Sequence, residues 1–109
     1  MTKMQILLDE EKIRREKKYN AQKIYAYVDS VFLEKCKLSK DADGYYSGHG
    51  GNDDLLRFGK ANYLLSNKDW FLDNVKVWKF FCNDDTESPD EYVVEDVRDF
   101  YLQKLGSRK

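Results

Sequence analysis

Apolar side chains recur at helical spacing along much of this chain, and this periodicity constrains the fold more than any other feature. In the second half of residues 9–36, Ile24 and Val28 belong to a row with the spacing of a helix that packs one face against a core. The first half is almost entirely charged, and Asn20 marks a break that would divide the segment into two helices. The preceding residues 4–8 fit either a first helical turn or a short strand. The N-terminal region is therefore predicted to be mainly helical.

Two segments in the middle of the chain are also predicted to be helical. Residues 52–66 begin with Asn52, a favourable N-cap, and two aspartates follow where the helix dipole favours negative charge. Residues 69–82 fit helical spacing over their full length. Residues 75–81 are nevertheless β-branched and aromatic, so a strand is the competing interpretation there.

The two tryptophans, Trp70 and Trp78, lie eight residues apart on the third predicted helix. This spacing puts them close to one helical face, within a row of phenylalanine and valine side chains. A core position is the simpler interpretation for both, because tryptophan buries a large apolar area. An interface or a ligand pocket is the alternative.

The C-terminal segment carries the clearest helix-start signal. Ser88, Pro89 and Glu91 occupy the N-cap, N1 and N3 positions of a capping box. Gly106 supplies a C-terminal stop. The predicted buried face of this helix consists of Val93, Val97, Phe100, Tyr101 and Leu105.

A single domain spanning residues 1–109 follows from the length of the chain. The helical segments predict a mainly α fold, an irregular bundle of four or five helices. Residues 39–52 contain glycines and aspartates in close succession, which is typical of a loop, and a small hairpin near residues 38–50 would also fit there. The alternative is an α+β fold with that hairpin and a strand near residues 75–81.

The side chains that usually carry catalysis or bind metal are few and scattered. The single histidine, His49, lies in a glycine-rich loop, which is a poor support for a catalytic base. Cys36 and Cys82 are far apart in the sequence and do not form a zinc-ligand pattern. The stretch from Asp84 to Glu95 partly fits a calcium loop, but proline stands where that loop requires glycine. We therefore expect no enzyme activity, no metal and no cofactor.

The cysteines and the hydropathy pattern also bear on the compartment. Two separated cysteines without a secretory signal are expected to be reduced core thiols. No run of residues approaches the length of an apolar membrane span. These features favour a cytoplasmic location. A domain of this size buries a limited share of its surface, so self-association as a homodimer is compatible with the sequence.

Charge is distributed unevenly along the chain. Residues 83–100 carry eight acidic side chains and one basic side chain, whereas residues 1–40 carry ten basic and six acidic ones. Such asymmetry is typical of electrostatic partner selection. The predicted partner-binding residues are Asp84, Asp85, Glu87, Asp90, Glu91, Glu95 and Asp99, with Tyr92 and Trp78 as aromatic anchors. A small protein-binding module that covers the basic groove of a nuclease-like toxin, as an immunity protein or inhibitor would, is the function that this pattern favours.

The alternative is a nucleic-acid-associated regulator that uses the basic N-terminal helix. Its predicted phosphate contacts are Lys12, Arg14, Arg15, Lys17, Lys18 and Lys23. Three glutamates lie among these residues and partly neutralise them. The isoelectric point near 5.8 is also lower than is usual for a nucleic-acid-binding domain, so nucleic acid is the less favoured partner.

Overall fold

The computed structural model describes residues 2–41, 44–51, 53–82 and 93–106, and for residues 105–106 it describes the backbone alone. In these residues the chain forms an α+β fold, with one antiparallel sheet in the strand order β2-β3-β1-β4-β5. The strands are β1 (Thr2–Leu8), β2 (Ser39–Lys40), β3 (Tyr45–Ser47), β4 (Val75–Cys82) and β5 (Val93–Asp96). The helices are α1 (Glu10–Glu16), α2 (Ala21–Asp29), the π-helix η1 (Ser30–Lys35), α3 (Asp54–Ser66), α4 (Asp69–Leu72) and α5 (Val97–Gly106).

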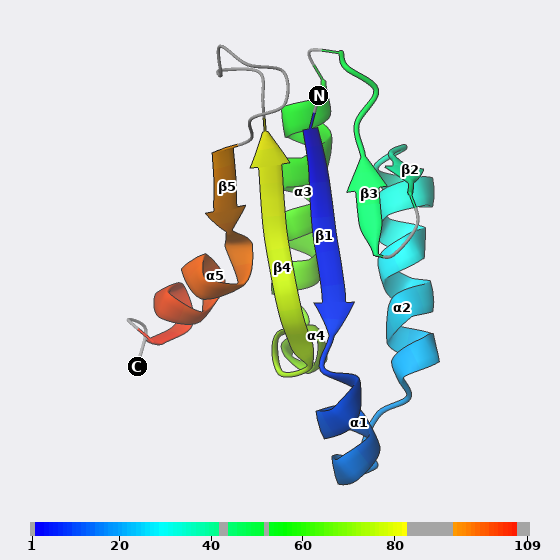
Figure 1. Ribbon diagram of the computed structural model, residues 1–109, viewed down its shortest axis with the longest axis vertical. Helices are drawn as coiled ribbons and strands as arrows, with labels where there is room; N and C mark the ends of the chain where they lie inside the picture. The colour runs from blue at the N-terminus through cyan, green and yellow to red at the C-terminus, as the bar shows by residue number, and fades with distance from the viewer. Residues whose placement is uncertain (1, 42–43, 52, 83–92, 107–109) are drawn as a thin grey trace.

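The sheet forms one layer of the molecule, and α2, α3 and α4 lie behind it (Figure 1). The prediction of a mainly α bundle is therefore wrong, and the α+β alternative describes the fold. The central strand β1 shows why the sequence did not reveal the sheet. Its even-numbered residues Thr2, Met4, Ile6 and Leu8 are buried, and the residues between them are only partly buried. This alternation is the two-residue period of a strand, but it occupies too short a stretch to be distinguished from a helical turn in the sequence.

The predicted helix over residues 69–82 ends after one turn. Helix α4 stops at Leu72, and β4 pairs with β1 in a register that places Trp78 opposite Ile6. Buried Asn74 fixes the turn between α4 and β4. Its side-chain amide donates to the backbone carbonyl of Trp70, and its backbone carbonyl accepts from the backbone N–H of Asp9. Pairing with a strand seventy positions away in sequence overrides the local helical spacing, as is common for segments rich in β-branched and aromatic residues.

The C-terminal helix begins later than predicted. Residues 93–96 form β5, and α5 begins at Val97, where a carboxylate oxygen of Asp96 accepts from the backbone of Asp99. The predicted capping box lies outside the described residues. Of the predicted buried face, Val97 is buried and Tyr101 is partly buried, whereas Val93 and Phe100 are 51% and 59% exposed. The side chain of Leu105 lies outside the described residues.

Three local predictions are confirmed. The long N-terminal segment breaks at Asn20, whose side-chain oxygen accepts from the backbones of Gln22 and Lys23 and so caps α2. Helix α3 occupies the segment predicted between residues 52 and 66, whereas the predicted N-cap Asn52 lies outside the described residues. The glycine-rich loop contains the β2–β3 hairpin, in which Gly44 adopts a φ of +81° that L side chains rarely tolerate. In each case the signal lies within a few residues of the feature that it predicts.

The hydrophobic core lies between the sheet and the helices and is centred on Trp78. This side chain is 0% exposed, and its indole N–H donates to the sulfur of Met4 at 3.3 Å. Its ring contacts Phe71 edge to face and stacks on Tyr101, so β1, β4, α4 and α5 all meet at this residue.

Both cysteines are free thiols, and burial raises the pKa of Cys36.

A buried carboxylate connects the N-terminus of α3 to β1. Asp54 is 5% exposed and accepts hydrogen bonds from the backbones of His49 and Gly50 and from the hydroxyl of Thr2. A side chain at Gly48 would collide with this carboxylate and with that hydroxyl. Burial alone would raise the pKa of Asp54, but the hydrogen bonds and the nearby His49 outweigh it and lower the pKa below its ordinary value.

Replacing this carboxylate should weaken the fold and change its response to acid. The folded-state pKa of Asp54 is lowered, so its stabilising effect is complete above the pKa of an unfolded aspartate, about 3.9, and is lost as the pH falls through the folded-state value. We expect Asp54→Asn to lower the free energy of unfolding near neutral pH by about 1–3 kcal/mol and to flatten its decline in acid. Urea unfolding across a pH series measures both effects.

The neighbouring variant Asp53→Asn is the matched control, since Asp53 is exposed and its side chain makes no capping hydrogen bond. Equal destabilisation by the two substitutions would show that the general charge at the start of α3, and not the buried carboxylate, carries the effect.

Candidate functional site

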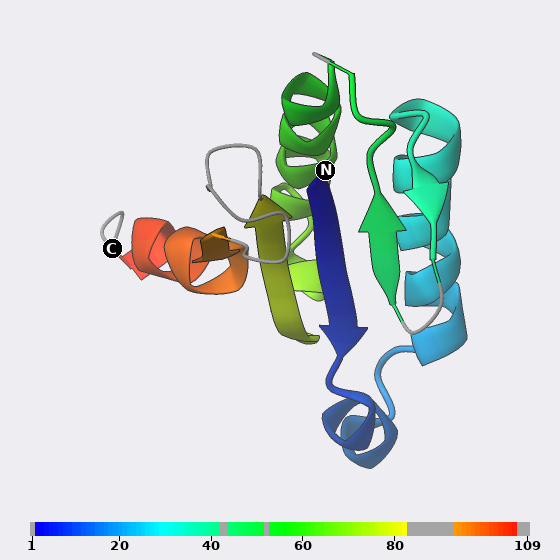
Figure 2. The ribbon, with the colours of Figure 1, turned by 45° about the horizontal axis from the view of Figure 1, so that its top comes forward.

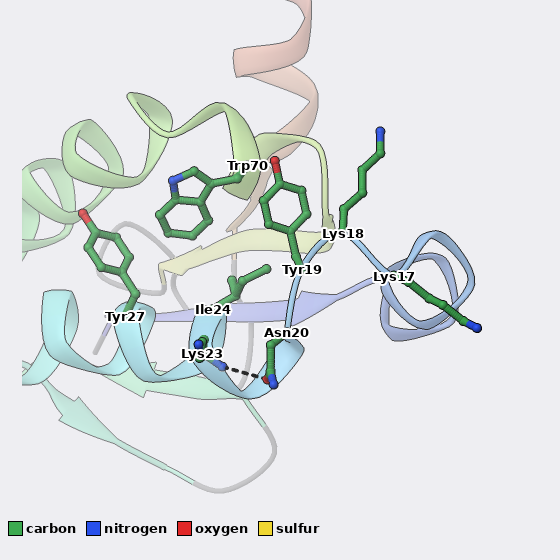
Figure 3. Close-up of a pocket in the computed structure, with 8 residues that line it drawn as sticks. All are labelled: Lys17, Lys18, Tyr19, Asn20, Lys23, Ile24, Tyr27 and Trp70. Atoms are coloured by element: carbon green, nitrogen blue, oxygen red, sulfur yellow. Dashed lines mark hydrogen bonds between the residues drawn. The ribbon is translucent and has the colours of Figure 1, made fainter.

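A pocket of about 620 Å³ opens where the turn between α1 and α2 meets α4. Figure 3 shows the side chains that line it: Lys17, Lys18, Tyr19, Asn20, Lys23, Ile24, Tyr27 and Trp70. These residues come from the α1–α2 turn, from the first turns of α2 and from α4. We call this site the basic–aromatic pocket.

Local backbone geometry brings the two sides of the pocket together. Lys17 ends α1 in the left-handed conformation, at a φ of 57°, and the chain then turns into α2 at Asn20. The rings of Tyr19, Tyr27 and Trp70 gather around Ile24 in Figure 3. Tyr27 and Trp70 meet at 5.1 Å between ring centroids with their planes 75° apart, so each limits the movement of the other.

Positive charge surrounds this aromatic wall. The ammonium groups of Lys35 and Lys68 lie 5.7 and 6.0 Å from the ring centroid of Tyr27. Lys18 extends from the rim of the pocket, whereas Lys17 points away from the rings (Figure 3). None of the residues that line the pocket is acidic, so the site favours an anionic ligand with an aromatic or apolar part.

The structure separates the six basic residues predicted to contact nucleic acid into two groups. Lys17, Lys18 and Lys23 line the pocket, and Arg14 and Arg15 lie exposed on α1 outside it. Lys12, the sixth residue, belongs to neither group. Its ammonium donates to the backbone carbonyl of Asp73 and lies 4.0 Å from a carboxylate oxygen of Glu16.

The aromatic half of the pocket was missed by the sequence analysis. Tyr19 directly follows the pair Lys17 and Lys18, and that pattern of bases beside an aromatic residue could have been noticed. Trp70 was assigned to the core, but its side chain is only partly buried and lines the pocket. Nothing in the sequence indicates that α4 packs beside the α1–α2 turn.

A second candidate surface lies at the edge of the sheet opposite to β2. We call it the β5–α5 edge, and it comprises Val93, Val94, Glu95, Asp96, Asp99 and Phe100. Figure 2 shows α5 projecting from this edge, on the far side of β4 from α2. Val93, Val94 and Phe100 are 51%, 50% and 59% exposed. Large exposed apolar side chains and carboxylates are therefore found together at this edge.

A hollow of about 640 Å³ lies at the β5–α5 edge, between α5 and α3. Its walls include the carboxylates of Glu95, Asp96 and Asp99 and the aromatic rings of Phe100 and Tyr101. Asn62 of α3 also lines it, and the buried side-chain oxygen of Asn62 accepts no hydrogen bond from the described part of the chain. This combination of acceptors and aromatic rings matches the needs of a lysine or arginine side chain.

The predicted acidic binding residues are only partly described. Glu95 and Asp99 lie at the β5–α5 edge and are exposed. Trp78 is completely buried in the core, so its side chain is not at the surface and cannot anchor a partner in this conformation. The remaining predicted residues, Asp84, Asp85, Glu87, Asp90, Glu91 and Tyr92, lie outside the described residues. Phe100, which the sequence analysis placed on a buried face, is the exposed aromatic residue of this surface.

The residues most often used in catalysis are dispersed. The ring of His49 contacts the backbone carbonyl of Lys37 at 2.7 Å, and Cys36 is buried with a raised pKa, which suits a core thiol better than a nucleophile. Within residues 2–41, 44–51, 53–82 and 93–104, no three histidine, cysteine, aspartate or glutamate side chains are grouped so that they could hold a metal ion. No helix in the described part of the chain is long and apolar enough to cross a membrane.

Comparison with known proteins adds no further assignment: no family model, curated protein or solved structure matches this chain. The two surfaces therefore rest on their own geometry and charge.

The two tryptophans should respond differently to small quenchers of fluorescence. Trp70 lines an open pocket among lysines, whereas Trp78 is fully buried. We expect iodide to quench part of the emission far more effectively than caesium, because the lysines concentrate anions and repel cations. Trp70→Phe should remove this quenchable fraction and leave emission that resists both ions.

The complementary variant Trp78→Phe should keep the iodide-sensitive emission, with circular dichroism confirming that it folds. Equal quenching by iodide and caesium in the original protein would contradict the basic character of the pocket.

Proposed function

We propose that this protein is a small binding module without enzyme activity, acting in the cytoplasm by stoichiometric contact with a basic protein through the β5–α5 edge. The observation that carries the proposal is the exposure of Val93, Val94 and Phe100 beside the carboxylates of this edge. Large apolar side chains that gather on a surface and are bordered by charge are typical of protein interfaces.

The shape of the edge supports a protein partner. Among the described residues, β5 is the edge strand of the sheet and pairs with β4 on one side, and an edge strand is where an extended segment of a partner can be added. The hollow beside it would receive a basic side chain against Phe100, with Glu95 as an acceptor. Backbone pairing would provide affinity, and the hollow would provide specificity for positive charge.

The kind of partner follows from the charge of the whole C-terminal region. Residues 83–100 carry eight acidic side chains against one basic side chain. A protein that binds nucleic acid has the complementary positive groove, and an acidic surface that covers the groove would block it. An inhibitor or immunity protein against a basic, nuclease-like toxin is the form of this function that the charge supports best.

Two substitutions at the β5–α5 edge should weaken the complex. The partner is first recovered from cells with the tagged protein and identified by mass spectrometry, and affinities are then measured with the purified pair. We expect Phe100→Ala and Glu95→Lys each to weaken binding by about ten-fold or more. The first removes an exposed aromatic anchor, and the second places a positive charge against the basic partner.

The controls change the same chemistry elsewhere on the surface. Leu56→Ala removes a side chain that is 74% exposed on α3, and Glu34→Lys reverses an exposed charge on η1. Both should leave the affinity nearly unchanged. If the controls weaken binding as much as the edge variants, the partner uses another surface. If reversal of Asp84, Asp85 and Glu87 alone abolishes binding, the contact lies in the preceding acidic segment and not in the edge.

A second candidate function is nucleic-acid binding by the basic N-terminal region. The observation in its favour is that Lys17, Lys18 and Lys23 line one pocket together with aromatic rings. Against it stand the local contacts of Lys12 and the three glutamates on α1, which reduce the positive charge of that helix.

A further inference from the structure

The basic–aromatic pocket has the size of a small-ligand site. Its volume of about 620 Å³ lies within the range of protein pockets that bind small molecules, roughly 300–1,000 Å³. The pocket does not include any residue of the β5–α5 edge, so a ligand here would not compete for the surface proposed to bind a protein. A separate role for the pocket is therefore structurally compatible with that function.

The aromatic wall of the pocket is held in place before any ligand binds. Tyr27 contacts Trp70 in an edge-to-face arrangement, and both side chains are partly buried against the core. Tyr19 is 45% exposed and lies beside Trp70 at the mouth of the pocket (Figure 3). A planar ligand would gain stacking contacts with Trp70 at little ordering cost, because that ring is already restrained by Tyr27.

The charge of the pocket comes from side chains and not from the helix terminus. Asn20 already accepts from the backbones of Gln22 and Lys23 at the start of α2, so these amide groups are not free for an anion. The first turn of α2 contains no acidic residue, and Lys18 and Lys23 stand at the rim. An anionic group would therefore be held by ammonium groups at the rim, next to the aromatic wall.

We infer that the basic–aromatic pocket binds a nucleotide unit, either a free nucleotide or one unit of a single strand. The base would stack against Trp70 and Tyr19, and the phosphate would lie at the lysine-bearing rim of the pocket. Aromatic rings beside positive charge are the combination that binds single-stranded nucleic acid, since every base offers a flat face and every unit carries a phosphate. This inference is independent of protein binding at the β5–α5 edge, and it deepens the second candidate function, which rests on the same pocket.

The two tryptophan indole N–H signals provide a direct test by nuclear magnetic resonance. The protein is labelled with nitrogen-15 in tryptophan, and Trp70→Phe assigns the two signals. Adenosine monophosphate and a short oligothymidylate are titrated separately at low salt. The chemical shift of the Trp70 signal should change until the pocket is saturated. The Trp78 signal should stay in place, because its N–H donates a hydrogen bond to the sulfur of Met4 in the core.

The two ligands distinguish a free nucleotide from a strand. If the mononucleotide saturates the signal of Trp70 at a concentration similar to that of the oligothymidylate, the pocket is assigned to free nucleotides. Much tighter binding of the oligothymidylate, with an affinity that falls as salt is raised, assigns it to one unit of a strand. Either outcome supports the inference.

Matched variants separate the pocket from general electrostatic attraction. Trp70→Leu should weaken binding by about ten-fold, the loss expected when one stacked base loses its platform. Lys18→Gln combined with Lys23→Gln should weaken binding and reduce its salt dependence. Arg14→Gln combined with Arg15→Gln removes the same charge from α1 outside the pocket and should leave the affinity nearly unchanged.

Three results would overturn the inference. The first is that neither ligand moves the signal of Trp70. The second is that inorganic phosphate alone moves it to the same extent, which would show a simple anion site. The third is that the oligothymidylate binds but loses as much affinity in the α1 variant as in the pocket variants, which would favour the basic-helix function instead.

Discussion

The pairing of β1 with β4 is the constraint on which the rest of the structure depends. β1 is the central strand, and its buried face supplies Met4 and Ile6 to the core around Trp78. The same strand also positions the basic–aromatic pocket. The backbone of Leu8 donates to the hydroxyl of Tyr25 on α2, and the next residue along the chain donates to the carbonyl of Asn74. These bonds place the α1–α2 turn beside α4, where the side chain of Trp70 completes the pocket. Removing the pairing would therefore remove the site as well as the core.

The two candidate surfaces differ in charge because they are built from different parts of the chain. The pocket uses the basic N-terminal region, and the β5–α5 edge uses the end of the acidic C-terminal region. The sheet holds them apart, with β1 and β4 between α2 and β5 (Figure 1). Substitutions at one surface are expected to have independent effects at the other, because no lining residue is shared.

Local signals in the sequence predicted local features well. The break at Asn20, the helix predicted over residues 52–66 and the hairpin near residues 38–50 each depend on a few neighbouring residues, and all appear in the structure. The strands depend on partners far away in the chain, and β1 and β4 could not be distinguished from helical segments by periodicity alone. The candidate sites followed the same rule. The charged residues were found because charge is visible in the sequence, whereas the exposure of Phe100 and the position of Trp70 depend on how β5 and α4 pack.

Exposed apolar side chains occur elsewhere on the described surface, but their arrangement at the β5–α5 edge is different. Leu55, Leu56 and Tyr63 are exposed on α3, and apolar residues exposed on a helix are normal on protein surfaces. On β5, apolar residues lie on an edge strand, which is a hazard because edge strands pair with one another. The adjoining carboxylates counter this hazard, since two copies of β5 placed side by side would bring Glu95 and Asp96 of both copies together. The repulsion disfavours a homodimer through this edge, and the same carboxylates would attract a basic segment. The carboxylates of this edge therefore favour a partner of opposite charge over a second copy of the chain.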